Sequence, residues 1–143
     1  MSKTALIVID FINAIVNPKS KKSVCADSVT QYHTIDKANL AIDFAQKNKL
    51  LIIFVNVGFS SNYIECNRRN SIFGKLPEME ILRLGTWDVE FDLRINSKAA
   101  DAIVTKNRVN CFYNTNLELI LKANRIDTLL LSGVSSEMAV ISR

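Results

Sequence analysis

The sequence predicts one α/β domain with three layers (α/β/α), in which helices cover both faces of a parallel sheet. Four segments are continuously apolar and rich in β-branched residues: 5–9, 50–57, 102–105 and 128–131. Continuous apolar runs, unlike alternating ones, are typical of strands that are buried on both faces. Segments with helical spacing lie between them, and this alternation predicts right-handed βαβ units.

The connections between these strands are predicted in turn. A long helix is expected between residues 27 and 48, where apolar residues recur every three or four positions. A second helix is expected from Leu117, with Thr115 as its N-cap. The stretch 58–96 is less regular, and we expect an active-site flap at 59–73 and a short helix at 77–84.

The end of the chain predicts a third helix. Residues 132–136 form a turn whose hydroxyl groups suit a helix cap, and Glu137 to Ile141 begin an apolar helix. Because so short a helix is marginal by itself, we expect a further helix and strand of this domain to be missing after Arg143.

Composition describes residues 1–143 as a single globular domain of 16.1 kDa, with 48% hydrophobic and 22% charged residues. The net charge of +4 is scattered, and the densest basic run, at 19–22, has no interleaved aromatic residues. We therefore expect no nucleic-acid partner. No apolar run reaches the ~18 residues of a membrane span and no signal peptide is recognisable, so we expect a cytoplasmic protein without a membrane partner.

Cysteine and histidine usage bears on cofactors. Cys25, Cys66 and Cys111 show no metal-binding spacing and are interpreted as free structural thiols in a reducing compartment. The sequence has a single histidine, His33, and so lacks the several imidazole ligands that a histidine-based zinc site needs. We expect neither a metal nor an organic cofactor.

Candidate catalytic residues end the predicted strands, because ligands of open α/β sheets bind at the carboxyl ends of the strands. Asp10 follows the first strand, Lys106 follows the third, and the turn 132–136 follows the fourth. A paired carboxylate and ammonium could move a proton, while amide groups of the helix start hold an oxyanion. The alternative is a solvated Asp and Lys, since polar residues are common at strand ends.

Five short motifs resemble the isochorismatase-like, or cysteine hydrolase, superfamily. In order, they are TALIVIDFIN at 4–13, LGTW at 84–87, VTKNR at 104–108, FYNTNL at 112–117 and LSGVSS at 131–136. Each is weak alone, but their order and approximate spacing also match. The resemblance implies a Rossmann-like fold with a six-stranded parallel sheet, a hydrolase activity on a small molecule, and a homodimer or larger homo-oligomer.

The resemblance also assigns roles to individual residues. It implies that Asp10 and Lys106 belong to an Asp-Lys-Cys constellation, and that the cysteine position falls on Ala139. A cis peptide shaping the oxyanion hole is implied at Val134–Ser135.

This sequence departs from the family pattern in two places, and the second departure bears on which activity is expected. Ile12 and Ala14 replace a Gln and an Asp of the family pattern, leaving Asn13, and no histidine lies between Gly58 and Trp87. The missing histidines disfavour a metal-dependent nicotinamidase.

Ala139 leaves three interpretations open, because a methyl group cannot attack a carbonyl. The first is a native hydrolase without a thiol, in which Asp10 is the acid, as in isochorismatases. The second is a cysteine amidohydrolase whose nucleophile has been replaced. The third is an inactive ligand-binding homologue.

The remaining candidates would bind the substrate, which we expect to carry a carboxylate. Arg108 could bind a substrate carboxylate or, equally, form a structural salt bridge. Trp87 could line the substrate pocket or be buried in the core. Asn13 and the backbone at Val134 and Ser135 complete the predicted binding residues.

Overall fold

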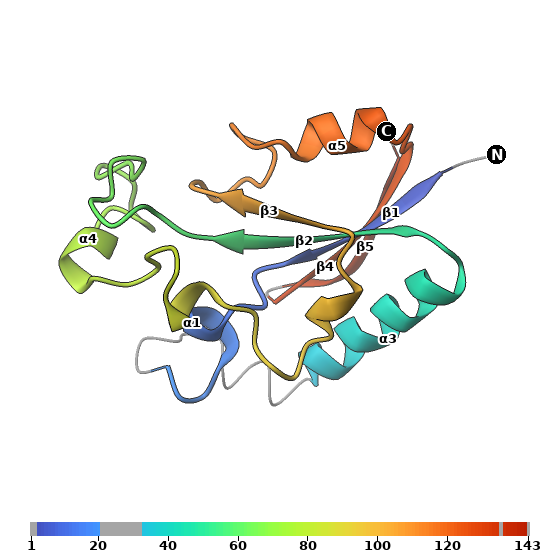
Figure 1. Ribbon diagram of the computed structural model, residues 1–143, viewed down its shortest axis with the longest axis horizontal. Coiled ribbons are helices and arrows are strands. Elements are labelled where there is room, and N and C mark those ends of the chain that lie inside the picture. The colour runs from blue at the N-terminus through green and yellow to red at the C-terminus, as the bar shows by residue number, and fades with distance from the viewer. Residues whose placement is uncertain (1–2, 21–32, 135, 143) are drawn as a thin grey trace.

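The computed structural model describes residues 3–20, 33–134 and 136–142. One five-stranded sheet with the order β3-β2-β1-β4-β5 forms its centre (Figure 1). The strands are β1 (Thr4–Ile9), β2 (Leu51–Val57), β3 (Ala102–Lys106), β4 (Thr128–Gly133) and β5 (Ser136–Ser142). The first four are parallel, which confirms the predicted α/β class and all four predicted strands.

Helices cover opposite faces of this sheet, as the continuous apolar strands require. In Figure 1, α5 (Leu117–Ala123) lies on one side of the sheet and α3 (Thr34–Lys47) on the other. Leu6 and Val8 of β1 pack in the core layer that includes α3, whereas Ala5 and Ile7 pack in the layer that includes α5. Alternate residues of one buried strand therefore serve two cores.

The predicted helices differ from the observed ones mainly at their ends. Helix α3 covers the second part of the predicted 27–48 segment, of which residues 27–32 lie outside the described residues. Helix α5 has Asn116 at its N-cap, yet Thr115 still accepts a hydrogen bond from the Leu117 amide at 3.3 Å. The predicted helix at 77–84 is a single turn, α4 (Leu76–Met79).

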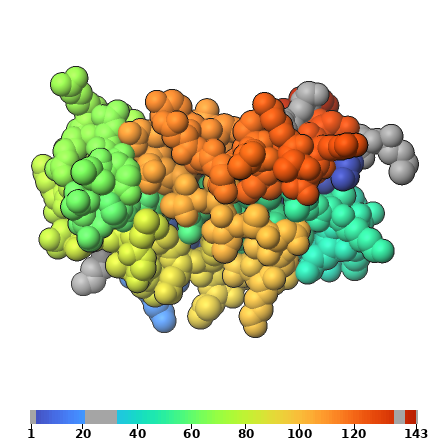
Figure 2. Space-filling model, turned by 45° about the horizontal axis from the view of Figure 1, so that its top comes forward, coloured from blue at the N-terminus to red at the C-terminus, as the bar shows by residue number. Residues whose placement is uncertain are grey.

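Loops between β2 and β3 extend over the carboxyl end of the sheet. They contain α4, η1 (Trp87–Val89) and η2 (Ser97–Ala99), and Figure 2 shows the segment around α4 as a lobe at one end of the molecule. Residues 90–92 pair with the segment that follows β1 and leads into α1 (Asn13–Val16). The Asn13 amide donates to Glu90 O at 2.9 Å, and the Asp92 amide donates to Phe11 O at 3.0 Å.

The C-terminal segment contradicts the prediction. Residues predicted to begin a helix form β5, which is antiparallel to β4 and places Ala139 opposite Leu131. Val140 and Ile141 are β-branched and favour a strand, and β5 gives the outer edge of β4 its hydrogen-bonding partner. The sheet is therefore not purely parallel.

Within the part of the chain that the structure describes, no helix combines the length and hydropathy needed to cross a membrane.

Candidate active site

Asp10 and Lys106 meet at the carboxyl end of the sheet. Lys106 ends β3 and reaches past the neighbouring strand β2, and its Nζ donates to Asp10 Oδ2 at 3.1 Å. The Lys106 side chain is 4% exposed and that of Asp10 22% exposed. The structure thus brings together the two residues that the sequence placed at one rim; their catalytic role stays a prediction.

The Asp10 carboxyl is largely enclosed, and its pKa departs from the ordinary value. Burial raises its pKa above the usual value, and the nearby Lys106 ammonium opposes that rise without cancelling it. Its second oxygen, Oδ1, is buried and has no hydrogen-bond partner among the described residues. Strongly enclosed carboxyls with a raised pKa are typical of acid–base sites.

The backbone at Asp10 turns the chain sharply out of β1. Its φ of 69° lies in the left-handed region, which Asp tolerates better than bulkier residues. The Asp10 amide still donates to Val55 O of β2 at 3.0 Å, so the residue stays anchored to the sheet. Asp10 is therefore fixed by its backbone and by the Lys106 ion pair.

Lys106 is held from a second direction. Its Nζ also donates to Val109 O at 3.0 Å, in the turn that follows β3. In the same turn, Asn107 Nδ2 donates to Gly58 O at 2.7 Å and ties the end of β2 to the turn. The ammonium group is consequently oriented by protein acceptors before any ligand is bound.

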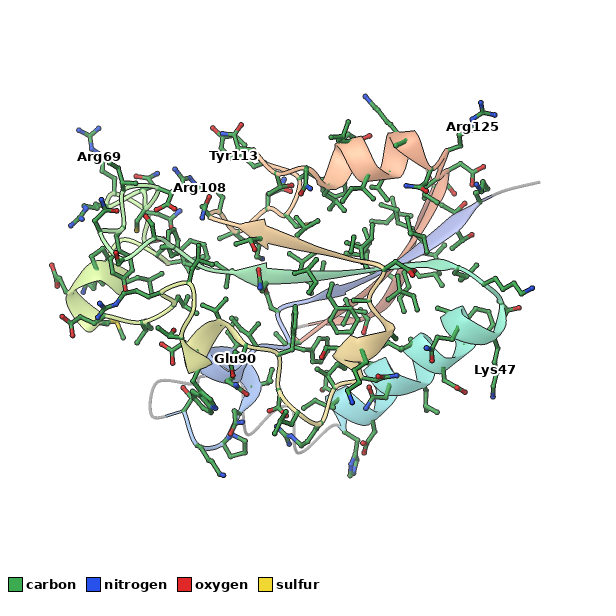
Figure 3. All side chains as sticks on the ribbon, viewed as in Figure 1. Lys47, Arg69, Glu90, Arg108, Tyr113 and Arg125 are labelled. Atoms are coloured by element: carbon green, nitrogen blue, oxygen red, sulfur yellow. The ribbon has the colours of Figure 1, made fainter. Side chains whose placement is uncertain are left out.

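Arg108 forms hydrogen bonds to backbone carbonyls of two loops. Its Nη1 donates to Glu65 O at 2.6 Å and to Asn107 O at 2.8 Å. Figure 3 shows Arg108 beyond the end of β3, beside the loop that carries Arg69. The guanidinium thus bonds one backbone carbonyl of the 59–73 segment and one of its own turn, which is neither of the two roles weighed from the sequence.

Asn13 and Trp87 contact each other away from the Asp10–Lys106 pair. Asn13 is buried, and its Nδ2 donates to Trp87 O at 3.0 Å while its Oδ1 accepts from Asn17. The Trp87 side chain is partly exposed and lies on a surface groove of about 470 Å³ that Asn13 and Arg94 also line. Asn13 is therefore occupied in holding η1.

The helix predicted to carry residue 139 and the anion site is replaced by β5 in the described residues. Ala139 is exposed on β5, level with Ile7 of β1 and two strands away from it, below the rim that carries Asp10. Val134 lies in the turn after β4, and among the described residues that follow it, 136–142, there is a strand and no helix start whose amide groups could hold an oxyanion. Ser135, and with it the expected cis peptide, lies outside the described residues.

Two thiols lie in the part of the chain that the structure describes, Cys66 and Cys111. Burial raises the pKa of Cys111, with Lys106 opposing and Asp10 adding to the rise, so this thiol stays protonated. Cys66 donates from its Sγ to Phe73 O at 3.2 Å, within the 59–73 segment. Cys25 lies outside the described residues.

Two polar residues near this end of the sheet, Asn56 and Asp92, were not among those predicted from the sequence. Asn56 is buried enough that its Oδ1 is inaccessible, and this oxygen has no partner among the described residues. Asp92 is 2% exposed and bound by Arg94 through two side-chain hydrogen bonds, at 3.0 and 2.8 Å. The signal for Asn56 was available, since it interrupts the otherwise apolar run 51–57.

The largely parallel sheet with helices on both faces makes this an α/β protein. The ion pair between Asp10 and Lys106, at the carboxyl ends of the strands, is its candidate acid–base site. The family model described as the Isochorismatase domain matches residues 4–142, and the chain belongs to this family. Its relatives include hydrolases, so the family is enzymatic.

Curated relatives and solved structures agree with this assignment. The chain is 25% identical to a ureidoacrylate amidohydrolase of Agrobacterium fabrum and 27% identical to that of Yersinia enterocolitica. The matches cover 99% of this chain in both cases, and 68% and 67% of those proteins. The chain thus spans about two thirds of the length of these relatives.

The fold similarity extends to solved structures. An N-carbamoylsarcosine amidase of Thermoplasma acidophilum aligns with a TM-score of 0.70 at 24% identity, over 92% of this chain and 67% of that one. An isochorismatase family protein of Desulfovibrio vulgaris aligns with a TM-score of 0.79 at 20% identity, over 93% and 67%. These likenesses concern the fold.

Proposed function

We propose that this chain is a hydrolase domain in which Asp10 acts as general acid and base on a small substrate and water is the nucleophile. The observation that carries the proposal is the buried contact between Asp10 and Lys106, at 3.1 Å. A carboxyl with a raised pKa holds its proton closer to neutral pH, where it can protonate a leaving group.

The role of Lys106 follows from its contacts. Because its ammonium donates to Asp10 Oδ2, the proton of a neutral Asp10 belongs on Oδ1, the oxygen without a partner. In the proposed reaction the neutral Asp10 carboxyl protonates the substrate, water adds at the carbon that becomes electron-poor, and the Asp10 carboxylate takes a proton from the added water. Asp10 then returns this proton to the leaving group as its bond to the tetrahedral carbon breaks, and it accepts the proton of the adduct's hydroxyl as the C=O bond forms. The same cycle fits a vinyl ether such as isochorismate, with pyruvate as a product.

The second candidate is an amidohydrolase, which the activities named for the relatives favour. Ureidoacrylate amidohydrolases and an N-carbamoylsarcosine amidase point to ureido or amide substrates. Against the thiol route stands Ala139, whose methyl group is not a nucleophile and lies on β5. A ureido substrate would therefore also depend on water and Asp10.

A ligand-binding domain without activity is the third candidate. It is favoured by one observation: amide groups of a helix start, which would stabilise an oxyanion, do not follow β4 in the described residues.

Turnover assays distinguish the three. Isochorismate, short amides and ureido acids are incubated with the wild-type chain, with Asp10→Asn and with the exposed control Asp43→Asn. We expect hydrolysis by the wild type and the control, and a loss of about 10²- to 10⁴-fold in kcat for Asp10→Asn. Hydrolysis that survives Asp10→Asn would refute the assigned role, and unchanged binding without turnover would favour the inactive protein.

The small-molecule partner and the homo-oligomer remain part of this proposal. Size-exclusion chromatography with light scattering, at several concentrations, tests the oligomer.

A further inference from the structure

The turn that follows β3, residues 107–110, supplies one of the two acceptors of the Lys106 ammonium. Lys106 Nζ donates to Asp10 Oδ2 at 3.1 Å and to Val109 O at 3.0 Å, and its side chain is 4% exposed. An ammonium group has three N–H donors, and burial makes an unbonded donor costly. Among the described residues, Val109 O is therefore the uncharged acceptor that this buried cation has besides Asp10.

Asn107 ties this turn to the residue that follows β2. The Gly58 amide donates to Lys106 O at 3.3 Å, and the Gly58 carbonyl accepts from Asn107 Nδ2 at 2.7 Å. Strands β2 and β3 lie side by side and end at the same edge of the sheet, as Figure 1 shows, which brings the two segments within reach. Both backbone groups of Gly58 are thus bonded to the end of β3, and the shorter bond comes from the Asn107 side chain.

Gly58 is a fixed point, because the chain packs directly against it. A Cβ at Gly58 would lie 2.6 Å from Leu84 Cδ2. The next residue, Phe59, is fully buried; its amide donates to Leu82 O and its carbonyl accepts from the Leu84 amide, both at 2.8 Å. The carbonyl that Asn107 binds is therefore held by β2 on one side and by the Phe59 contacts on the other.

The second tie of the turn, from Arg108, is looser by construction. Arg108 Nη1 donates to Glu65 O at 2.6 Å and to Asn107 O at 2.8 Å. An arginine side chain has more rotatable bonds than that of asparagine, so it can follow a displaced turn while its hydrogen bonds persist. The short Asn107 side chain has no such freedom and fixes the turn more closely.

We propose that Asn107 is a positioning residue for the pair formed by Asp10 and Lys106. By holding its turn on Gly58, Asn107 keeps the Val109 carbonyl at the ammonium group and so keeps that group directed at the carboxyl. Small displacements of reacting groups are costly, and supporting contacts of this kind prevent them. The catalytic consequence rests on the proposed function, whereas the effect on the ammonium requires no turnover.

Hydrogen exchange of the Lys106 ammonium tests the proposal. In ¹⁵N-labelled protein the Nζ resonance of a buried lysine can be followed by NMR when hydrogen bonds slow the exchange of its protons with water, and its loss in Lys106→Met assigns it. We expect Asn107→Ala to speed this exchange about five- to tenfold, which corresponds to the loss of one hydrogen bond. Asn107→Gln retains the amide donor and should slow the exchange again.

Asn39→Ala is the matched control. Asn39 lies on α3 and is half-buried like Asn107; its Nδ2 donates to Arg94 O at 2.8 Å and its Oδ1 accepts from the Asn96 amide at 2.9 Å. The control therefore loses at least as many bonds, so it should lower the urea midpoint of unfolding but leave the ammonium exchange unchanged. If Asn107→Ala does not fold, Asn107→Ser takes its place, because the serine hydroxyl is one atom shorter and does not reach the Gly58 carbonyl.

Three results would overturn the inference: unchanged ammonium exchange in Asn107→Ala, an equal increase in Asn39→Ala, or no recovery in Asn107→Gln. Where the chain hydrolyses a substrate, kcat should fall in Asn107→Ala while KM changes little, and Asn39→Ala should retain both values. Faster exchange in Asn107→Ala, together with a wild type that hydrolyses nothing, refutes the hydrolase only. Hydrolysis by the wild type with unchanged exchange in Asn107→Ala refutes the positioning role only.

Discussion

Lys106 donates a hydrogen bond to Asp10 across the end of β2, over 3.1 Å, from a side chain that is 4% exposed. Residues 96 positions apart are thereby joined in one buried contact. Each partner has a different way to respond when the other is removed. A carboxyl with a raised pKa can become neutral by taking up a proton, whereas a buried ammonium has a harder adjustment.

This asymmetry predicts unequal losses of stability. Asp10→Ala should lower the free energy of unfolding by about 3–5 kcal/mol, because it leaves the Lys106 ammonium buried beside a single acceptor, Val109 O. Lys106→Met should cost less, because Asp10 then becomes neutral. Urea unfolding of both variants at neutral pH measures the difference. Equal losses, or a larger loss for Lys106→Met, would contradict the prediction.

A pH dependence follows from the raised pKa of Asp10. The folded chain holds this proton at pH values where the unfolded chain, with a pKa near 3.8, has lost it. The free energy of unfolding is therefore greatest, as regards this group, below pH 3.8 and falls as the pH rises through the folded-state pKa. Asp10→Asn removes this dependence.

The pKa of Asp92 is shifted in the opposite direction from that of Asp10, so its effect on stability changes with pH in the opposite sense. Burial opposes its ionisation, but the hydrogen bonds from Arg94 outweigh burial and lower its pKa. Its contribution is present above pH 3.8 and is lost as the pH falls through the folded-state pKa. Urea unfolding of the wild type, Asp10→Asn and Asp92→Asn between about pH 2.5 and 7 separates the two groups. Parallel curves for the wild type and Asp10→Asn would contradict the raised pKa.

Restoring a thiol at residue 139 should not create a cysteine hydrolase. Ala139 is exposed on β5, level with Ile7, so Ala139→Cys places its sulfur away from Asp10. We expect a thiol that reacts readily with Ellman's reagent and no gain in amide hydrolysis. Amidase activity that appears in Ala139→Cys and disappears in Ala139→Ser would show that residue 139 lies at the catalytic rim.

Arg108 is predicted to act on loop stability and not on carboxylate selectivity. Arg108→Met removes two hydrogen bonds to backbone carbonyls and should lower the free energy of unfolding by about 1–3 kcal/mol. Arg69→Met, in the neighbouring exposed loop, is the matched control and should change stability little. The kcat/KM values for carboxylate-bearing and neutral substrates should fall together in Arg108→Met. A selective loss for carboxylates would instead place Arg108 at the substrate.

Local sequence predicted much of this architecture. The apolar segments became β1 to β4, and the central strands β1 and β2 are covered on both faces, as continuous apolar runs predict. The edge strand β3 instead alternates buried and exposed residues, with Ile103 55% exposed. Asp10 and Lys106 could be paired in advance, since the carboxyl ends of parallel strands share one edge of the sheet. Asn56 was not among the residues predicted to lie near the site, although it interrupts an apolar strand.

Long-range pairing decided what local pattern could not. The hydroxyls of residues 132–136 suit a helix cap, yet residues 136–142 form β5, because β4 offers an edge whose hydrogen bonds need a partner. That choice separates Ala139 from Asp10. The contact between Asp10 and Lys106 likewise joins the ends of β1 and β3, which only the folded chain brings together. In this protein the local sequence determines which segments of the parallel sheet become strands. The candidate active site depends instead on which groups, distant in the sequence, become hydrogen-bond partners in the folded chain.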